Sequence, residues 1–268
     1  MKLIFMGTAG ARFMVFKQIA ASGGIYLEHE NARLAMDPGP GAVVQYAKRK
    51  VDLTKLTGVL LSHKHLDHAT DVNVVIEGMT DGGFRHRGTV FCPPDAIDPE
   101  PVVFPYLRGF PEQIVQLQPQ TAYDLGPLHF RTSRKHPHNF PNRASVDTFG
   151  FVFQGGLLGW VTDTRYYEGI EEEHRAEVMV LHTVIERGRE ELPHLGVDDV
   201  ERIIRAARPK LAIITHFGMG VWRLHPWEVA ADLAQRTGVA VKAARDGMRL
   251  DVDAAVAGES ETPDAAAS

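Results

Sequence analysis

The sequence predicts an α/β fold in which two β-sheets pack together in one domain with helices outside them. Short apolar runs typical of buried strands fill the first half, and the second half alternates such runs with helical patterns. No low-complexity linker separates the halves, and 268 residues fit one large domain. Two packed sheets covered by helices are the simplest layered arrangement for this chain. We predict a single domain over residues 1–253 and a disordered tail over residues 254–268, which are mostly small, polar and acidic.

The first half is predicted to consist mainly of strands joined by turns. A strand at Lys2–Met6 is followed by Gly7 and Gly10, but the GxGxxG pattern of a dinucleotide-binding turn is absent. The segment 37–41 (Asp-Pro-Gly-Pro-Gly) is a strong turn signal, and the proline-rich residues 93–119 indicate a long excursion. The other elements predicted in this half are strands at Ile25–Glu28, Arg33–Met36, Thr57–Leu61, Thr89–Cys92 and Ile114–Leu117, a helix over Val43–Lys50, and a helix from Asp67 or His68 to Met79.

The second half is predicted to mix buried strands with amphipathic helices. A helix over Pro226–Thr237 has proline in its first turn, where no backbone donor is needed. Asp246-Gly247 is a hairpin signal, so we expect Val239–Ala243 and Met248–Val252 to pair. The remaining predicted elements are strands at Leu128–Ser133, Thr148–Gln154, Leu157–Thr162, Val178–His182 and Leu211–Thr215, and a helix over Val197–Ala207.

Composition and charge exclude several classes of protein. The formal net charge of -5 argues against a general nucleic-acid binder, although a local basic patch would be compatible with it. No apolar stretch approaches the roughly 18 residues of a membrane span, and the N-terminal apolar run is too short for a signal peptide. Cys92 is the single cysteine, so no intramolecular disulfide can form. We therefore expect a cytoplasmic protein with a small-molecule substrate, and a homodimer is compatible with these features.

Three histidines and an aspartate lie within six residues, at His63, His65, Asp67 and His68. Alternate side chains of an extended segment share a face, so His63 and His65 can reach one point, and a turn lets His68 reach a second point nearby. Imidazole and carboxylate are the ligands that zinc, iron and manganese accept. The HxHxDH segment therefore predicts a metal site.

Further potential ligands follow later apolar runs. His136 and His138 follow one predicted strand, Asp163 ends another, and His216 ends a third. Residues that follow buried strands collect at a sheet edge, so these side chains are candidates to complete the site. His136 and His138 both qualify for one position, and we favour His138. Surface positions are expected for His29, His86 and His174.

Taken in order, the turn aspartate Asp37, the HxHxDH loop, His138, Asp163 and His216 resemble the metallo-β-lactamase superfamily from the first strand to about Leu250. The resemblance implies a four-layer αββα sandwich with two divalent metal ions at one edge, zinc being favoured over manganese or iron. It implies that His63, His65 and His138 hold the first ion, that Asp67, His68 and His216 hold the second, and that Asp163 bridges them. Asp37 would orient ligands, and His136 would face the pocket or a neighbouring carbonyl.

Within the superfamily, the sequence is similar to the branch that contains ribonuclease Z and the phosphonate-pathway phosphodiesterases. Residues 7–10 and 37–41 look like the openings of that branch, and Asp163 stands where the main subclass of zinc β-lactamases has cysteine. The resemblance implies a hydrolase that attacks a small phosphodiester or cyclic nucleotide with a metal-bridging hydroxide, with Asp67 and His194 as catalytic residues. No long arm that would grip transfer RNA is evident. A thioester or lactone hydrolase with the same metals is the alternative.

Overall fold

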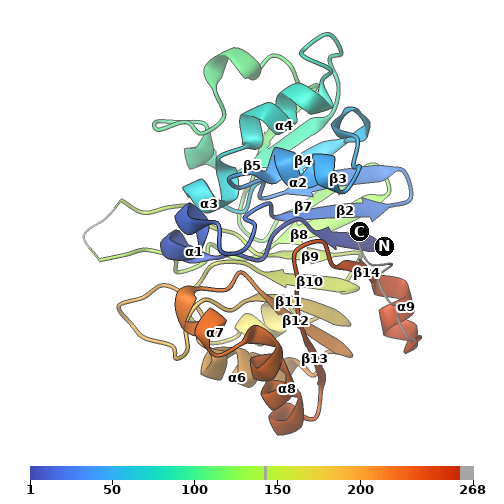
Figure 1. The fold of residues 1–268 in the computed structure, drawn as a ribbon. Helices are drawn as coiled ribbons and strands as arrows, with labels where there is room; N and C mark the ends of the chain where they lie inside the picture. Colours follow the sequence, from blue (N-terminus) through green and yellow to red (C-terminus); the bar gives the residue numbers. More distant parts are fainter. Residues whose placement is uncertain (142–143, 260–268) are drawn as a thin grey trace.

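Two seven-stranded β-sheets face each other in the computed structural model, which describes residues 1–141 and 144–259. Helices cover the outer face of each sheet, so the layers run helix, sheet, sheet, helix (Figure 1). The predicted αββα sandwich is confirmed. The first sheet has the order β14 (Arg249–Asp251), β1 (Lys2–Phe5), β2 (Ile25–His29), β3 (Ala32–Met36), β4 (Gly58–Leu60), β5 (Thr89–Cys92) and β6 (Gln113–Gln116). The second has the order β13 (Ala240–Ala243), β12 (Leu211–Thr215), β11 (Val178–His182), β10 (Leu158–Val161), β9 (Phe151–Phe153), β8 (Leu128–Thr132) and β7 (Ala122–Leu125).

Three apolar layers hold the sandwich together. Between the sheets, side chains such as Phe5, Leu34 and Trp160 are almost fully buried. The outer face of the first sheet is covered by α2 (Ala42–Lys48) and α4 (Val72–Met79), and that of the second by α6 (Val197–Ala207) and α8 (Pro226–Thr237). The central strands are therefore buried on both faces, which explains why their sequences are continuous apolar runs instead of alternating ones. Short helices complete the chain: α1 (Ala11–Lys17), α3 (Leu66–Ala69), α5 (Ile170–Glu173), α7 (Met219–Arg223) and α9 (Val252–Ala257), with 3-10 turns at Leu53–Lys55, Pro94–Ala96 and Pro105–Leu107.

Parallel pairing in both sheets brings the ends of several strands to one edge. Strands β3 to β6 are parallel in the first sheet, and β10 to β13 are parallel in the second. Their carboxyl ends carry the polar residues that follow the apolar runs. The residues that leave these ends include Asp37 after β3, His63 after β4, Asp163 after β10, His182 at the end of β11 and His216 after β12.

The predicted C-terminal hairpin is wrong. β13 pairs in parallel with β12 in the second sheet, whereas β14 pairs antiparallel with β1 in the first. Asp246 lies in the connection, where its carboxylate accepts hydrogen bonds from Thr8 Oγ1 and the Ala21 backbone nitrogen, both at 2.8 Å. These contacts anchor the connection as it crosses from one sheet to the other (Figure 1).

Two other predicted elements differ from the structure, besides shifts of one to three residues at the ends of several more. The helix expected from residue 67 or 68 to Met79 is two helices, α3 and α4, and the Asp71 backbone nitrogen between them bonds Pro38 O at 2.9 Å. The predicted start of the disordered tail, residue 254, falls inside α9, whose first turn is capped by the Asp251 carboxylate. Residues 260–268 of the predicted tail lie outside the described residues.

In the described part of the chain, no helix combines the length and the apolar character needed to cross a membrane.

Candidate metal centre

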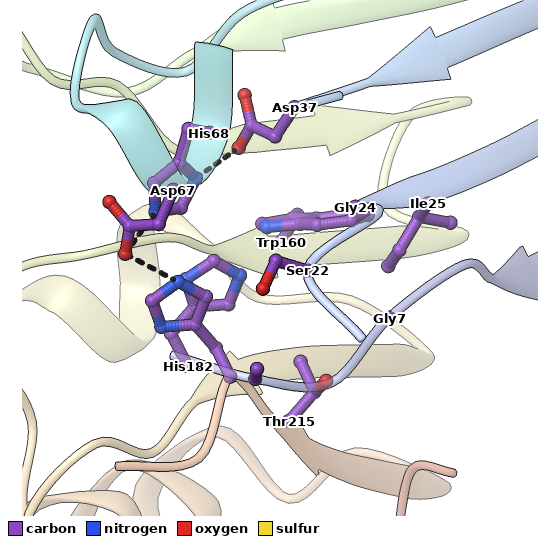
Figure 2. Close-up of a pocket in the computed structure, with 12 residues that line it drawn as sticks. Gly7, Ser22, Gly24, Ile25, Asp37, Asp67, His68, Trp160, His182 and Thr215 are labelled. Atoms are coloured by element: carbon purple, nitrogen blue, oxygen red, sulfur yellow. Dashed lines mark hydrogen bonds and ion pairs between the residues drawn. The ribbon is translucent and has the colours of Figure 1, made fainter. Parts of the chain in front are cut away.

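Asp37 holds the HxHxDH loop against the end of β3. Its carboxylate accepts hydrogen bonds from the Ser62 backbone nitrogen at 2.7 Å and from Ser62 Oγ at 2.6 Å. The same carboxylate lies 3.0 Å from His68 Nδ1, which directs the other ring nitrogen, Nε2, toward the interior of the site. Figure 2 shows the His68 ring between the carboxylates of Asp37 and Asp67. Asp37 therefore has the geometry of the ligand-orienting residue that the sequence predicted.

One group of side chains that could hold a metal ion consists of His63, His65 and His138, whose candidate ligand atoms all lie within 4.8 Å of one another. His138 Nδ1 donates to Pro193 O at 2.7 Å, so its Nε2 faces His65 Nδ1, 3.1 Å away. His63 Nδ1 lies 3.0 Å from Ser62 Oγ, which leaves His63 Nε2 directed at the same point. The three donor nitrogens thus come from the HxHxDH loop and from the segment after β8.

A second group consists of His68, Asp163, His182 and His216. Asp67 borders it, with its Oδ2 3.7 Å from His68 Nε2 and 3.6 Å from His216 Nε2. Asp163 lies between the two groups, because its Oδ2 is 3.7 Å from both His138 Nε2 and His68 Nε2. The structure therefore brings together all seven side chains that the sequence predicted as ligands.

The donor atoms fit a pair of divalent cations. His63 Nε2, His68 Nε2 and both ring nitrogens of His216 are buried and have no hydrogen-bond partner among the described residues. Buried polar atoms are nearly always satisfied, so a cluster of unsatisfied imidazole nitrogens around a carboxylate indicates a site for cations. Imidazole and carboxylate together suit zinc, iron and manganese.

Electrostatics favour the protonation states that metal binding requires in the first group and at Asp163. At His68, burial lowers the pKa, but the carboxylates of Asp67 and Asp37 outweigh it and raise the pKa well above its usual value. Burial lowers the pKa of His63 well below its usual value and the pKa of His138 to about 4. Burial alone would raise the pKa of Asp163, but the surrounding imidazoles, His216 foremost, hold it well below its usual value. The imidazoles of the first group are thus neutral at pH 7 and Asp163 is ionised, which are the forms that ligate a metal.

His182 was not among the predicted site residues. It ends β11, its Nδ1 lies 2.8 Å from Asp163 Oδ1, and its ring is parallel to that of His216 with the centroids 4.3 Å apart. It also lines a small cavity beside His68 and Trp160 (Figure 2). The sequence did contain the signal, because His182 ends an apolar run in the same way that His216 follows one.

His136 belongs to neither group of potential ligands. Its Nδ1 lies 3.2 Å from the Asp163 carbonyl oxygen and 3.3 Å from Thr162 Oγ1, and its Nε2 lies 3.3 Å from His174 Nε2. His136 therefore contacts a neighbouring carbonyl, one of the two positions expected for it, and packs beneath the segment that carries Asp163. The expected surface position of His174 is wrong, since its side chain is fully buried against Gly150 and His136. His86 is exposed and His29 is half-buried.

His194 lies at the border of the two groups and, with His138 and Asp163, forms a third set of potential ligands whose atoms lie within 4.8 Å of one another. Its Nδ1 is 3.5 Å from Asp163 Oδ2, and its ring centroid is 4.9 Å from that of His138. Pro193, next to it, accepts the hydrogen bond from His138 Nδ1, which fixes the segment against the first group. Burial lowers the pKa of His194.

We predict that His174 makes the metal-free protein sensitive to acid. Burial lowers the pKa of His174 to about 4, whereas an unfolded chain binds a proton near pH 6.5. The unfolded state therefore carries about one more proton between these values, and the free energy of unfolding falls as the pH falls through this window. Replacing His174 by glutamine should flatten the dependence of the melting temperature on pH between about 6.5 and 4. The exposed variant His86→Gln is the control, and an unchanged slope in His174→Gln would contradict the prediction.

Comparisons with known proteins agree with this architecture. The model of the β-lactamase superfamily domain matches residues 32–217. An uncharacterized protein of Methanocaldococcus jannaschii, MJ1374, is 27% identical over 262 residues, which cover 94% of this chain and 95% of that protein. Among solved structures, the metallo-β-lactamase fold protein YhfI from Bacillus subtilis has a TM-score of 0.71 at 17% identity and covers 93% of this chain and 98% of its own. A diphosphatase from the PhnP family has a TM-score of 0.69 at 14% identity, and the match covers 93% of this chain and 97% of the diphosphatase.

Proposed function

The chain belongs to the metallo-β-lactamase superfamily and is a metallo-hydrolase, and from this premise we propose that it is a phosphodiesterase with a small phosphodiester or cyclic nucleotide as its substrate. The observation that carries the proposal is the position of Asp163 between two groups of imidazoles, with one carboxylate oxygen 3.7 Å from a histidine of each group. Such an arrangement suits two ions that share a ligand. The likeness to a PhnP-family diphosphatase supports a substrate that is cleaved at phosphorus.

We assign the ligands as the sequence predicted. His63, His65 and His138 would hold the first ion, Asp67, His68 and His216 the second, and Asp163 both. Two divalent ions, most simply zinc given the histidine-rich donor set, would activate water for attack and polarise the ester. Asp37 and His182 would keep His68 and Asp163 oriented through contacts of 3.0 Å and 2.8 Å between imidazole nitrogens and carboxylate oxygens. Cytoplasmic residence and a homodimer stay predictions from the sequence.

His194 is proposed to serve the leaving group. It approaches Asp163 from beside the first group, and its side chain is 11% exposed, so one part of the ring reaches solvent while Nδ1 is buried. A histidine at the border of a hydrolytic site can donate a proton to the departing oxygen or stabilise its developing charge. His194 thus would act on the substrate instead of on the metals.

Metal content and hydrolysis measured together test the proposed function. Protein purified without added metal should contain about two zinc or manganese ions per chain by elemental analysis. The same preparation should hydrolyse bis-p-nitrophenyl phosphate. Metal without phosphodiester cleavage, combined with hydrolysis of thioesters or lactones, would replace the proposal by the alternative reaction. A chain that binds no metal even after reconstitution would refute both.

Replacing His194 by alanine should lower the turnover number for the phosphodiester by about 10²- to 10⁴-fold, the usual contribution of a general acid. The metal content should stay at the wild-type value, because the seven proposed ligands are intact. Turnover measured by stopped assay and metal measured by elemental analysis give the two readouts. A loss of metal that parallels the loss of turnover would show that His194 is a ligand.

A further inference from the structure

A wide groove that the proposed function does not use lies between the outer helix layers. It runs between the ends of α1 and α2 on one side and α8 and β13 on the other, beneath the connection from β13 to β14. Its volume of about 1220 Å³ exceeds the roughly 300–1,000 Å³ of typical small-molecule pockets, so an extended ligand would fill it better. We call it the basic groove and define it by the lining residues Lys48, Arg49, Lys50, Arg245, Arg249 and Trp227.

Five cations that line the basic groove have no carboxylate partner in the described chain; Lys242 also lines it but has a partner of its own and is not counted with them. Among the described residues, none of the five forms an ion pair, whereas arginines elsewhere, such as Arg175 and Arg236, do. Asp246 supplies the one carboxylate among the lining residues, and both its oxygens accept hydrogen bonds from Thr8 and Ala21. Five unpaired cations thus give this groove a local positive charge in a chain whose net charge is -5.

Arg49 is a cation of the groove that is held in place. Its Nη1 donates to Gln45 Oε1 at 2.5 Å, and its Nε is buried without a hydrogen-bond partner in the described chain. The guanidinium packs on Gly247, where a Cβ atom would come within 2.7 Å of Nη2 and 2.8 Å of Nε, so Gly247 covers Nε. A guanidinium that is fixed in this way and lines the groove can offer its charge and its remaining donors to an acceptor oxygen.

An exposed aromatic side chain accompanies these cations. Trp227, in the first turn of α8, is 51% exposed, and its ring stacks on His225 with the centroids 5.2 Å apart and the planes 9° apart. The apolar residues Ala230, Ala231 and Val241 line the groove beside it. A positively charged groove with an accessible aromatic face is the usual arrangement for binding single strands, because phosphates track the cations and a base stacks on the ring.

We propose that the basic groove binds single-stranded nucleic acid at a site distinct from the metal centre. Residues Gln18–Ala21 line the groove, whereas Ser22 and Gly24, just beyond them, line the cavity beside His68. The segment 18–24 therefore forms a wall between the two sites. The net charge predicted no nucleic-acid partner because it averages over the surface, whereas five unpaired cations lie together in this groove. An acidic polypeptide would also satisfy the cations, but it would not need the ring of Trp227.

Fluorescence anisotropy with a labelled oligothymidylate of about a dozen nucleotides tests the proposal on the full metal-loaded protein, and a gel shows that the strand stays intact. We expect binding whose logarithmic salt dependence has a slope of about −2 to −3.5, since each phosphate contact contributes about −0.7 on a single strand. The variant Lys48→Ala/Arg245→Ala should make this slope shallower by about 1.4. Trp227→Ala should weaken binding at least about fivefold.

Matched controls lie outside the groove. Phe84 is 91% exposed and Arg85 is paired with Asp81, so the variant Phe84→Ala/Arg85→Ala removes an aromatic and a cation without touching the groove. It should bind the strand as the wild type does. Every variant should keep the wild-type melting temperature and its hydrolysis of bis-p-nitrophenyl phosphate, because no altered residue belongs to the metal centre. These measurements distinguish a failure of the groove to bind the strand from a failure of the proposed hydrolysis.

Three results would overturn the proposal. The first is no binding at 100 μM protein in low salt, because the weakest non-specific complexes have dissociation constants of about 10⁻⁴ M. The second is binding that the groove variants leave unchanged. The third is equal affinity for a polyglutamate peptide with no effect of Trp227→Ala, which would assign the groove to an acidic protein.

Discussion

Replacing Asp67 by alanine should reduce phosphodiester hydrolysis to background and lower the metal content from about two ions per chain to about one. The Asp67 carboxylate is the group that lies nearest both His68 Nε2 and His216 Nε2 without being shared with the first group of ligands. Its removal takes a charged donor from the second ion only. His63, His65 and His138 stay in place for the first ion. Elemental analysis and a hydrolysis assay on the same preparation measure both effects.

The fold of this variant should persist, because the Asp67 side chain is partly exposed and the loop is anchored by Asp37 and Ser62. The circular dichroism spectrum of the variant should therefore match that of the wild type. Asp81→Ala, which removes an exposed carboxylate outside the site, is the matched control and should behave as the wild type. Near-normal turnover in Asp67→Ala would refute a mechanism that needs two ions.

Replacing Asp163 by alanine should cost both ions and should also destabilise the protein. Asp163 contacts histidines of both groups, because Oδ1 lies 2.8 Å from His182 and 3.3 Å from His216 and Oδ2 lies 3.7 Å from His138 of the first group. Burial lowers the pKa of His68, but the carboxylates of Asp67 and Asp37 outweigh that effect and raise it well above its usual value, so a cationic ring would be left beside a missing carboxylate. Removing one partner of a buried ion pair costs about 3–5 kcal/mol in the free energy of unfolding. Denaturant titration of the metal-free variants would measure this difference.

The isosteric variant Asp163→Asn separates the loss of volume from the loss of charge. It keeps the volume and one acceptor oxygen but not the carboxylate charge, so we expect neither the metal content nor the ion-pair part of the stability to return. A variant Asp163→Ala that retained two ions per chain would show that the two groups are filled independently of this residue.

Three buried strands and two amphipathic helices could be predicted from the sequence to the residue. Thr89–Cys92, Val178–His182 and Leu211–Thr215 have the predicted bounds because burial on both faces leaves short, uninterrupted apolar runs. The helices Val197–Ala207 and Pro226–Thr237 also match, since each buries a single apolar stripe. Local sequence patterns are enough to predict an element when its own sequence determines which of its side chains are buried.

Long-range pairing could not be predicted in the same way. Asp246-Gly247 has the composition of a tight turn, but the partner of β14 is β1, at the other end of the chain. Helix α1 was missed because Phe13 and Phe16 are exposed while Met14 and Val15 are buried, so apolar residues occupy both of its faces. No local pattern indicates which of these faces is covered.

The candidate site shows the same limit. The HxHxDH loop could be recognised because its four potential ligands lie within six residues. The later candidates were found because each follows an apolar run. The burial of His174 could not be predicted, since it depends on the close approach of Gly150, which comes from a different strand region. Sequence spacing therefore located the donors of the site better than the residues that support them.

The pairing of β1 with β14 has a consequence for how the protein is made. β6 ends at Gln116 and β14 begins at Arg249, so about half of the chain is synthesised after the rest of the first sheet is available. During that time one side of β1, with its buried Leu3 and Phe5, has no neighbouring strand. An uncovered strand edge invites pairing with other chains, and contacts of long sequence separation form slowly. Nascent chains of this protein should therefore depend on chaperones until the last strand leaves the ribosome.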